Sequence, residues 1–371
     1  MTLSGTSQAT AVAGGIASLT REFLREQVGI SSPSASLIKA AMINGATDLG
    51  VADIPNPSEG WGQVNLERTV LPTDGSTVLA TNYDDGKSLK SGFGLLYELD
   101  LNPSHGIDIT LVWSDEAGSA NSAQSQSKLV NNLDLILIDP SGNEWLGNDF
   151  SSGFSTQGGT ADELNNVERI KIAPDTYTNS GKWLVKVMHR SGDTQKYSIV
   201  MTADASLQPK SDLTTFNGSI YLSSQSPLQN DIISIRVAWM NQGTLDTSGF
   251  HWILEDITEG TILIQGDSQG VSSSEIESVI TTRSFSTTGI HTLQLSIDTD
   301  SEVVEMNDEI SGIDNNVITQ DIEVTSLGVR VVVLNDDGSQ PSTPSERESS
   351  AVKVFDAVSY THLTLPTKRI V

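Results

Sequence analysis

The segment IDITLVW at residues 107–113 places apolar side chains at alternate positions, so that they share one face of an extended strand. Similar short runs, separated by turn-forming residues, occur throughout residues 75–203. They lie at residues 77–83, 94–101, 133–138, 167–172, 183–188 and 197–202. Many short strands with turns between them predict an antiparallel sandwich or a jelly roll.

A second β unit is predicted over residues 212–325. Its clearest strands lie at residues 232–241, 252–255, 261–265, 278–284 and 291–298. The segment SLQPK at residues 206–210 is expected to link the two units. Residues 326–357 are assigned to the start of a further β segment or to a linker, because residues 336–350 are polar and contain proline.

Composition limits the possible partners of this 371-residue chain, whose length predicts two or three domains. The formal net charge of -26 repels phosphate backbones and anionic lipids, which disfavours nucleic-acid and membrane-surface roles. The absence of cysteine excludes a disulfide scaffold, a thiol nucleophile and Cys-ligated zinc. No window is apolar over the length needed to span a bilayer, and residues 1–30 show no signal peptide.

The first part of the chain follows the period of a helix. Val12, Ile16, Leu19 and Phe23 recur at three- and four-residue spacing, which predicts a helix over residues 8–27. Two helices cannot close a core alone, so this part is expected to belong to a larger domain. The apolar face of the first helix must then find another surface or stay exposed.

A second helix is predicted from about Pro33 to Asn44. Ser32 is expected to cap it, and Pro33 suits its first turn.

The segment SGTSQAT at residues 4–10 leads directly into the first predicted helix. A serine hydroxyl is a weak nucleophile unless a base takes its proton and nearby dipoles stabilise the developing charge. At a helix start, Ser7 would lie among unpaired backbone N–H groups, and its own N–H could act as one oxyanion donor. Gly5 would let a substrate backbone approach closely. The alternative is that Ser4, Thr6 or Ser7 only caps the helix.

Three segments occur in the order found at the end of a subtilisin-like catalytic domain. They are GTSQAT at residues 5–10, LIKAA at residues 37–41 and GWGQVN at residues 60–65. Residues 1–70 therefore resemble the C-terminal end of the catalytic domain in the subtilase family of serine proteases.

The resemblance implies a serine endopeptidase that cleaves polypeptide substrates through an acyl-enzyme on Ser7, with Gly5 and Thr6 beside the substrate and the oxyanion. In this family the catalytic Asp and His precede the serine in the chain. All five histidines follow Ser7: His105, His189, His251, His291 and His362. We therefore expect Met1 to be an internal residue, and the chain to be inactive without the N-terminal part of its own catalytic domain. The family also implies an extracellular, secreted protein.

The two β units carry resemblances of their own. Residues 75–203 resemble the jelly-roll domain that follows the catalytic domain in one group of subtilases and is related to P domains. The segments that carry this resemblance are LVWSD at 111–115, NLDL at 132–135, DPSG at 139–142, GND at 147–149 and NNVE at 165–168. Residues 212–325 more loosely resemble a CARDB-type β-sandwich. The jelly roll implies a stabilising partner for the protease core, and the sandwich a spacer or adhesion module.

The expected fold class is therefore mainly β: two helices from the end of a subtilisin α/β domain, then a jelly roll and a β-sandwich. Residues 358–371 resemble translated sequencing-adapter read-through and are left out of the fold reasoning.

Four acidic residues of the jelly-roll region lie at strand ends or turns with asparagines close by: Asp115, Asp134, Asp149 and Glu168. Carboxylate and amide oxygens are the ligands that calcium prefers, so a structural calcium ion is one interpretation. The alternative is that Asp and Asn cap turns and cover sheet edges. No organic cofactor is expected.

The segment GDSQG at residues 266–270 matches the G-x-S-x-G pattern of hydrolases. That pattern marks a nucleophile only between a strand and a helix. Here it lies between two strand-like runs, which predicts a hairpin turn around Ser268. The alternative function for the whole chain is a non-catalytic secreted β-sandwich protein for adhesion or glycan binding, with a degenerate protease remnant.

Overall fold

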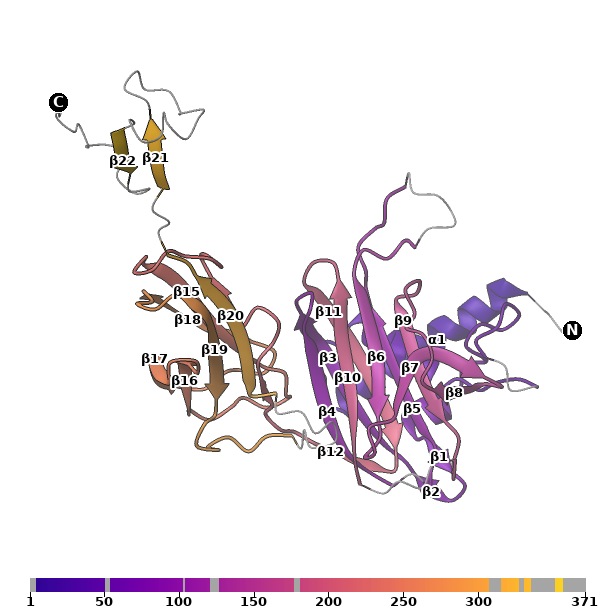
Figure 1. The fold of residues 1–371 in the computed structure, drawn as a ribbon. Helices are drawn as coiled ribbons and strands as arrows, with labels where there is room; N and C mark the ends of the chain where they lie inside the picture. Colours follow the sequence, from indigo (N-terminus) through magenta and orange to yellow (C-terminus); the bar gives the residue numbers. More distant parts are fainter. Residues whose placement is uncertain are drawn as a thin grey trace, which may run out of the picture.

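A computed structural model describes residues 5–50, 54–102, 104–120, 127–176, 181–306, 315–326, 330–334 and 351–355. Residue Ser4, the stretch 336–350 and the tail that includes His362 lie outside the described residues. The described part is mainly β, as the sequence predicted (Figure 1). None of its helices is both long and apolar enough to cross a membrane.

The first β domain consists of two antiparallel sheets that face each other (Figure 1). A short pair, β1 (Thr73–Asp74) and β2 (Thr77–Val78), precedes it. Its strands are β3 (Ala80–Leu89), β4 (Gly94–Leu101), β5 (Ile107–Trp113), β6 (Asn132–Ile138), β7 (Glu144–Ser151), β8 (Phe154–Gln157), β9 (Val167–Ile172), β10 (Gly181–Ser191), β11 (Gln195–Ala203) and β12 (Ala205–Gln208). One sheet has the order β12-β4-β10-β6-β7-β8, and the other has the order β3-β11-β5-β9.

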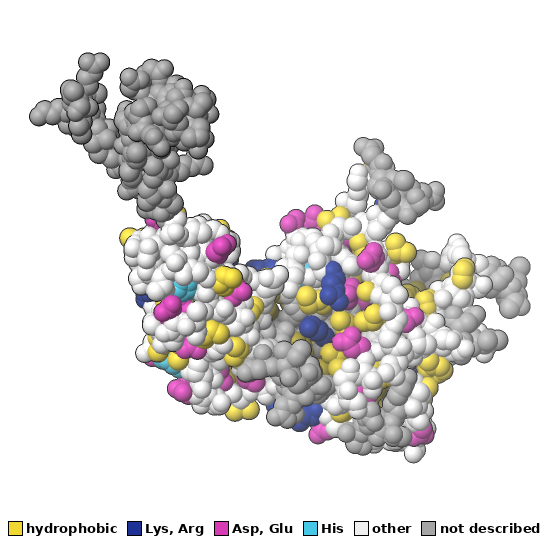
Figure 2. Space-filling view, viewed as in Figure 1, with side chains coloured by type: hydrophobic (Ala, Val, Ile, Leu, Met, Phe, Trp, Pro, Cys, Tyr) yellow, Lys and Arg dark blue, Asp and Glu magenta, His cyan; other side chains and the backbone are white. Residues whose placement is uncertain are grey.

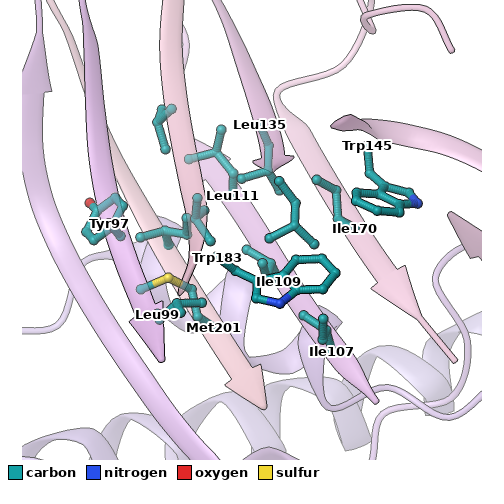
Figure 3. Packing of buried hydrophobic residues seen from close by; sticks show 14 of the residues in the cluster. Tyr97, Leu99, Ile107, Ile109, Leu111, Leu135, Trp145, Ile170, Trp183 and Met201 are labelled. Atoms are coloured by element: carbon teal, nitrogen blue, oxygen red, sulfur yellow. The ribbon is translucent and has the colours of Figure 1, made fainter. Parts of the chain in front are cut away.

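Alternate side chains of these strands fill the space between the two sheets. Ile109 and Leu111 on β5 are fully buried, and they face Leu135 on β6 across the core (Figure 3). Trp145 and Trp183 stack with their ring centroids 5.6 Å apart. Each fully buried aliphatic side chain contributes roughly 1.5–3 kcal/mol, so this core can hold the domain together without disulfides.

The second β domain is also a sandwich. Its strands are β13 (Leu213–Thr214), β14 (Ile220–Leu222), β15 (Ile233–Asn241), β16 (Phe250–Asp256), β17 (Thr261–Ser268), β18 (Ile276–Arg283), β19 (Gly289–Ile297) and β20 (Val317–Val324). In one sheet β15 pairs with β13, β14 and β18; the other sheet has the order β17-β16-β19-β20. Trp239 and Trp252, with ring centroids 5.0 Å apart, pack between the sheets. Beyond this domain, β21 (Arg330–Leu334) pairs with β22 (Ala351–Phe355).

The two domains touch along the outer face of the six-stranded sheet. The Leu96 N–H donates to the Gln242 carbonyl at 2.8 Å. The rings of Phe93 and Phe216 meet edge to face at 5.0 Å. A hollow of about 680 Å³ lies between the domains. Figure 2 shows hydrophobic and basic side chains gathered on this side of the jelly roll.

Three helices precede the first sheet: α1 (Thr6–Glu26), α2 (Ala35–Asn44) and α3 (Leu66–Val70). Helix α2 packs on the four-stranded sheet, where Leu37 meets Val112 and Val200. The predicted cap at Ser32 is wrong. The Ser34 side chain is the cap and accepts from the Leu37 N–H at 3.0 Å, so the helix begins two residues later than Pro33.

Two further expectations need correction. Residues 205–208 form β12 and pair with β4, so the predicted linker at 206–210 is largely part of the sheet. The turn that follows Ser268 is not a hairpin, because β17 and β18 belong to opposite sheets of the second domain. The segment is still strand–turn–strand, and the Ser268 hydroxyl donates to the Glu277 carboxylate at 2.5 Å.

Candidate functional site

Ser7 lies in the first turn of α1, as the sequence predicted. The helix has Gly5 at its N-cap position, and among the described residues no side chain caps it. The N–H groups of Gln8 and Ala9 both donate to the Gly5 carbonyl, at 3.2 and 3.3 Å. Apart from Gly5 and its two chain neighbours, no heavy atom of the described residues lies within 4 Å of a Cβ placed on Gly5. Ser7 itself is exposed at the helix start.

The first two-thirds of α1 has little cover from the described residues. Val12 keeps 56% of its surface exposed and Leu19 keeps 48%. Only Thr20 and Leu24 are buried, and Leu24 joins the cluster formed by α2 and the four-stranded sheet. The apolar face that predicted the helix is thus half solvent-facing.

Each described histidine has partners away from the helix start. The His105 ring contacts Asp74 at 3.1 Å. His189 is buried between the carbonyls of Leu89 and Ser191. In the second domain, the remaining two bind carboxylates: His251 binds Asp267 at 2.7 Å and His291 binds Asp256 at 2.6 Å. None of these four described histidines is bonded to a residue of α1.

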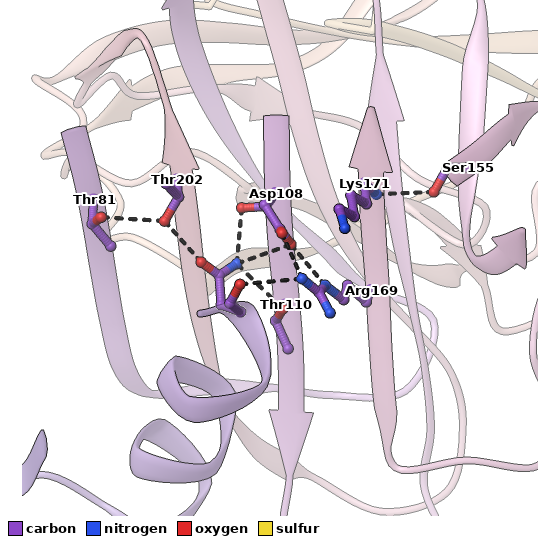
Figure 4. A network of polar contacts seen from close by, with 8 residues as sticks. Thr81, Asp108, Thr110, Ser155, Arg169, Lys171 and Thr202 are labelled. Carbon is purple, nitrogen blue, oxygen red and sulfur yellow. Dashed lines mark hydrogen bonds and ion pairs between the residues drawn. The ribbon is translucent and has the colours of Figure 1, made fainter. Parts of the chain in front are cut away.

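A buried polar network fixes the end of α2 to the jelly roll (Figure 4). The Arg169 guanidinium, 1% exposed, donates to both oxygens of Asp108, at 2.8 and 2.5 Å, and to the Asn44 carbonyl at 3.1 Å. The Asn44 amide donates to the Asp108 carbonyl at 2.9 Å, and its oxygen accepts from Thr202 at 2.8 Å. This network links the last turn of α2 to β5, β9 and β11.

The other end of α2 is held by a carboxylate. Asp85 on β3 accepts from the Ser34 N–H at 2.8 Å and from its hydroxyl at 2.6 Å. Ser198 on β11 donates to the same carboxylate at 2.7 Å. Both ends of α2 are therefore anchored in the jelly roll by groups that sequence reasoning did not single out. The available signal was Asp108, the single charged residue of β5. Arg169 gave no such signal, because it is one of three charged residues in β9.

Two of the four predicted calcium ligands serve separate local structures. Asp115 accepts from the Val130 and Asn131 N–H groups at 2.7 and 2.9 Å. Asp149 accepts from the Thr156 hydroxyl at 3.0 Å. These contacts resemble the turn-capping alternative.

The other two, Asp134 and Glu168, are brought together. The Glu168 carboxylate accepts from the Leu135 N–H at 2.6 Å, which places it beside Asp134. Burial raises the pKa of both carboxyl groups, and that of Glu168 lies well above its usual range. Arg190, which donates to Asp134 at 2.5 Å, works in the opposite direction. The described residues contain no group of three or more His, Asp or Glu placed to hold a metal ion.

Comparison with known proteins links the chain loosely to proteases. No family model matches it. Two Dictyostelium discoideum proteins, named serine protease/ABC transporter B family proteins tagA and tagB, are similar. The first is 34% identical over 222 residues, and the second is 28% identical over 257 residues. Each match covers 54% of this chain, but the chain spans only 12% and 13% of the relatives.

Solved structures give weaker matches. The CARDB domain of a Pyrococcus furiosus protein is 20% identical and covers 31% of this chain and 90% of that domain, with a TM-score of 0.27. A putative β-galactosidase from Bacteroides fragilis is 10% identical, covering 68% of this chain and 37% of that one, with a TM-score of 0.25.

Proposed function

We propose that this chain is the C-terminal part of a secreted, subtilisin-like serine endopeptidase in which Ser7 is the nucleophile. The observation that carries the proposal is the position of Ser7, exposed in the first turn of a helix that follows Gly5 and has no side-chain cap among the described residues. The protease names of the two Dictyostelium relatives support the reaction class.

In the proposed mechanism, Ser7 attacks the carbonyl carbon of the scissile peptide bond. A histidine from the N-terminal part of the catalytic domain takes the hydroxyl proton and passes it to the leaving amine. The Ser7 N–H donates to the oxyanion, helped by the positive end of α1. Water then hydrolyses the acyl-enzyme and frees the serine.

In this proposal the jelly roll acts as a support for the catalytic domain. Helix α2 is anchored through Asp85 at one end and through Arg169 at the other. Helix α1 packs on α2 through Leu24, so the nucleophile helix is held indirectly by the sheet.

The test uses the longer protein that includes the upstream catalytic residues. We expect a serine-directed phosphonate to label Ser7, and Ser7→Ala to lower kcat/KM for a peptide substrate by at least about a thousandfold. The matched control is Ser18→Ala, because Ser18 lies on the exposed side of the same helix. The 371-residue chain alone should not be labelled. If Ser7→Ala kept wild-type activity, the assignment would be wrong. A longer protein that the phosphonate does not label would favour the adhesion alternative.

A further inference from the structure

We infer that Asn132, Asp134 and Glu168 form a calcium site at the start of β6, where the two sheets of the jelly roll approach each other. The inference does not depend on the chemistry of Ser7. It also replaces the four-residue set that the sequence indicated, because it omits Asp115 and Asp149 and includes an amide oxygen.

The first observation concerns three buried oxygen atoms. Asn132 Oδ1, Asp134 Oδ1 and Glu168 Oε1 are all shielded from solvent and have no hydrogen-bond partner. The Asp134 and Glu168 side chains are each only 1% exposed. A buried acceptor without a partner destabilises the folded state, and more so when it is charged. Three such atoms on β6 and on the Glu168 side chain that reaches it require an explanation, and a bound cation supplies one.

The second observation concerns how the strands place these oxygens. Asn132 and Asp134 are alternate residues of β6, so their side chains leave the same face of that strand. Glu168 comes from β9 in the opposite sheet, and its other oxygen accepts from the Leu135 N–H. That hydrogen bond fixes one oxygen of Glu168 and leaves Oε1 unpaired next to Asp134.

The charge around the pair also favours a cation. Arg190 donates to Asp134 Oδ2 and is the basic side chain bonded to the pair. Asp162 and Glu163 act on the pair with negative charge, because each raises the pKa of Asp134. These two carboxylates, together with Asp134 and Glu168, carry four formal negative charges, and Arg190 offsets one of them. The formal charge around the pair is therefore -3. A hollow of about 440 Å³ is lined by Asn132, Asp134, Glu163 and Arg190, and it gives a cation access to the Asp134 side of the pair.

Calcium fits this donor set better than other metals. Two carboxylates and an amide are hard oxygen ligands, and calcium completes its six to eight contacts with water in flexible geometry. Magnesium needs a near-ideal octahedron, and zinc prefers nitrogen and sulfur ligands. A proton shared between Asp134 and Glu168 would also relieve the repulsion between their carboxylates. The test must therefore distinguish a shared proton from a bound calcium ion.

The experiment measures calcium binding to the 371-residue chain by isothermal titration after treatment with a chelator. We expect one site, and calcium at about a hundred times Kd should shift the folding equilibrium about a hundredfold toward the native state. Amide exchange should slow in β6 and β9. Magnesium at equal concentration should have a smaller effect.

Variants identify the ligands. Glu168→Gln and Asp134→Asn keep the shape of the side chains and remove one charge each, so each should abolish the calcium response without preventing folding in chelator. The matched controls Asp115→Asn and Asp149→Asn should keep the calcium response. Absence of a response in wild type would overturn the inference and favour the shared proton, as would a response that survives in Glu168→Gln and Asp134→Asn. If a variant does not fold, calcium-dependent protection of β6 and β9 in wild type still decides.

Discussion

Helices α1 and α2 come from the same predicted remnant, but the chain covers them very differently. In α2, Leu37, Ala40 and Ala41 are 0–2% exposed, and both helix ends are bonded to the jelly roll. In α1, Val12 and Leu19 are about half exposed, and buried positions begin only at Thr20. Helix α1 is amphipathic in sequence and α2 is largely apolar. Both need a partner surface, yet only α2 has its surface in the described part of the chain.

The two helices belong to one segment by sequence resemblance, but they pack against different surfaces. The jelly roll is fitted to α2, because Val112 and Val200 on its outer face meet Leu37. The same sheet does not reach the start of α1, where Ser7 lies. Helix α1 is therefore placed to receive another surface, and in the proposed enzyme that surface is the upstream catalytic domain.

The largest effect is expected from breaking the network that anchors α2. Arg169→Met should lower the free energy of unfolding of the jelly roll by about 3–5 kcal/mol, because Asp108 loses its buried charge partner. Urea unfolding followed by circular dichroism measures this. The control is Arg68→Met, because the Arg68 side chain is exposed on α3, and we expect a change within about 0.5 kcal/mol. Equal effects of the two substitutions would show that the network does not anchor the helix.

A second prediction compares the two helices with one chemical change. Leu37→Ala should cost about 2–5 kcal/mol, because it leaves a cavity against the sheet. Leu19→Ala should change the free energy of unfolding by about 0.5 kcal/mol or less, because Leu19 is 48% exposed. Chemical denaturation of both variants gives the comparison. A large cost for Leu19→Ala would mean that α1 has a partner surface that the described residues do not include.

The sequence predicted these elements well where a single period dominates. The strands over residues 94–101, 107–113 and 167–172 match β4, β5 and β9 residue for residue. Prediction failed where a strand forms only because a neighbouring strand pairs with it. The segment SLQP at 206–209 has no strong strand pattern, yet residues 205–208 pair with β4. Glycine and serine around Ser268 indicated a tight turn, but no local signal shows that the flanking strands lie in opposite sheets.

The candidate sites show the same limit. Ser7 could be placed from local pattern, because a motif and a helix start are both local features. The Asp134–Glu168 pair could not, because Glu168 reaches β6 from the opposite sheet. The Arg169–Asp108 contact joins residues 61 positions apart, and only the register of β5 with β9 makes them neighbours.

The smallest effect is expected from replacing Lys39 on α2. Its side chain lines a hollow between α2, Ala17 of α1 and the segment around Trp61. That hollow, about 360 Å³ in volume, is lined by largely apolar residues that include Ile38, Met42 and Trp61, and the Lys39 stem lies along it. Partial burial lowers the pKa of Lys39. Because the side chain is still exposed to solvent, Lys39→Met should stabilise the protein by only about 0.5 kcal/mol or less near neutral pH.

The lowered pKa of Lys39 fixes the direction in which the stability difference between wild type and Lys39→Met changes with pH. Between the lowered folded pKa and the unfolded value of about 10.4, the unfolded chain binds more protons, so wild-type stability rises with pH over that interval. Lys39→Met lacks this gain, so its advantage should shrink toward pH 10. Lys39→Arg stays charged throughout and should also lack the gain. Urea unfolding of the three proteins near neutral pH and at about pH 10 measures the difference. If the wild type gained nothing on Lys39→Met over that range, the lysine stem would be fully hydrated, and the surface between α1 and α2 would not be an apolar one awaiting a partner.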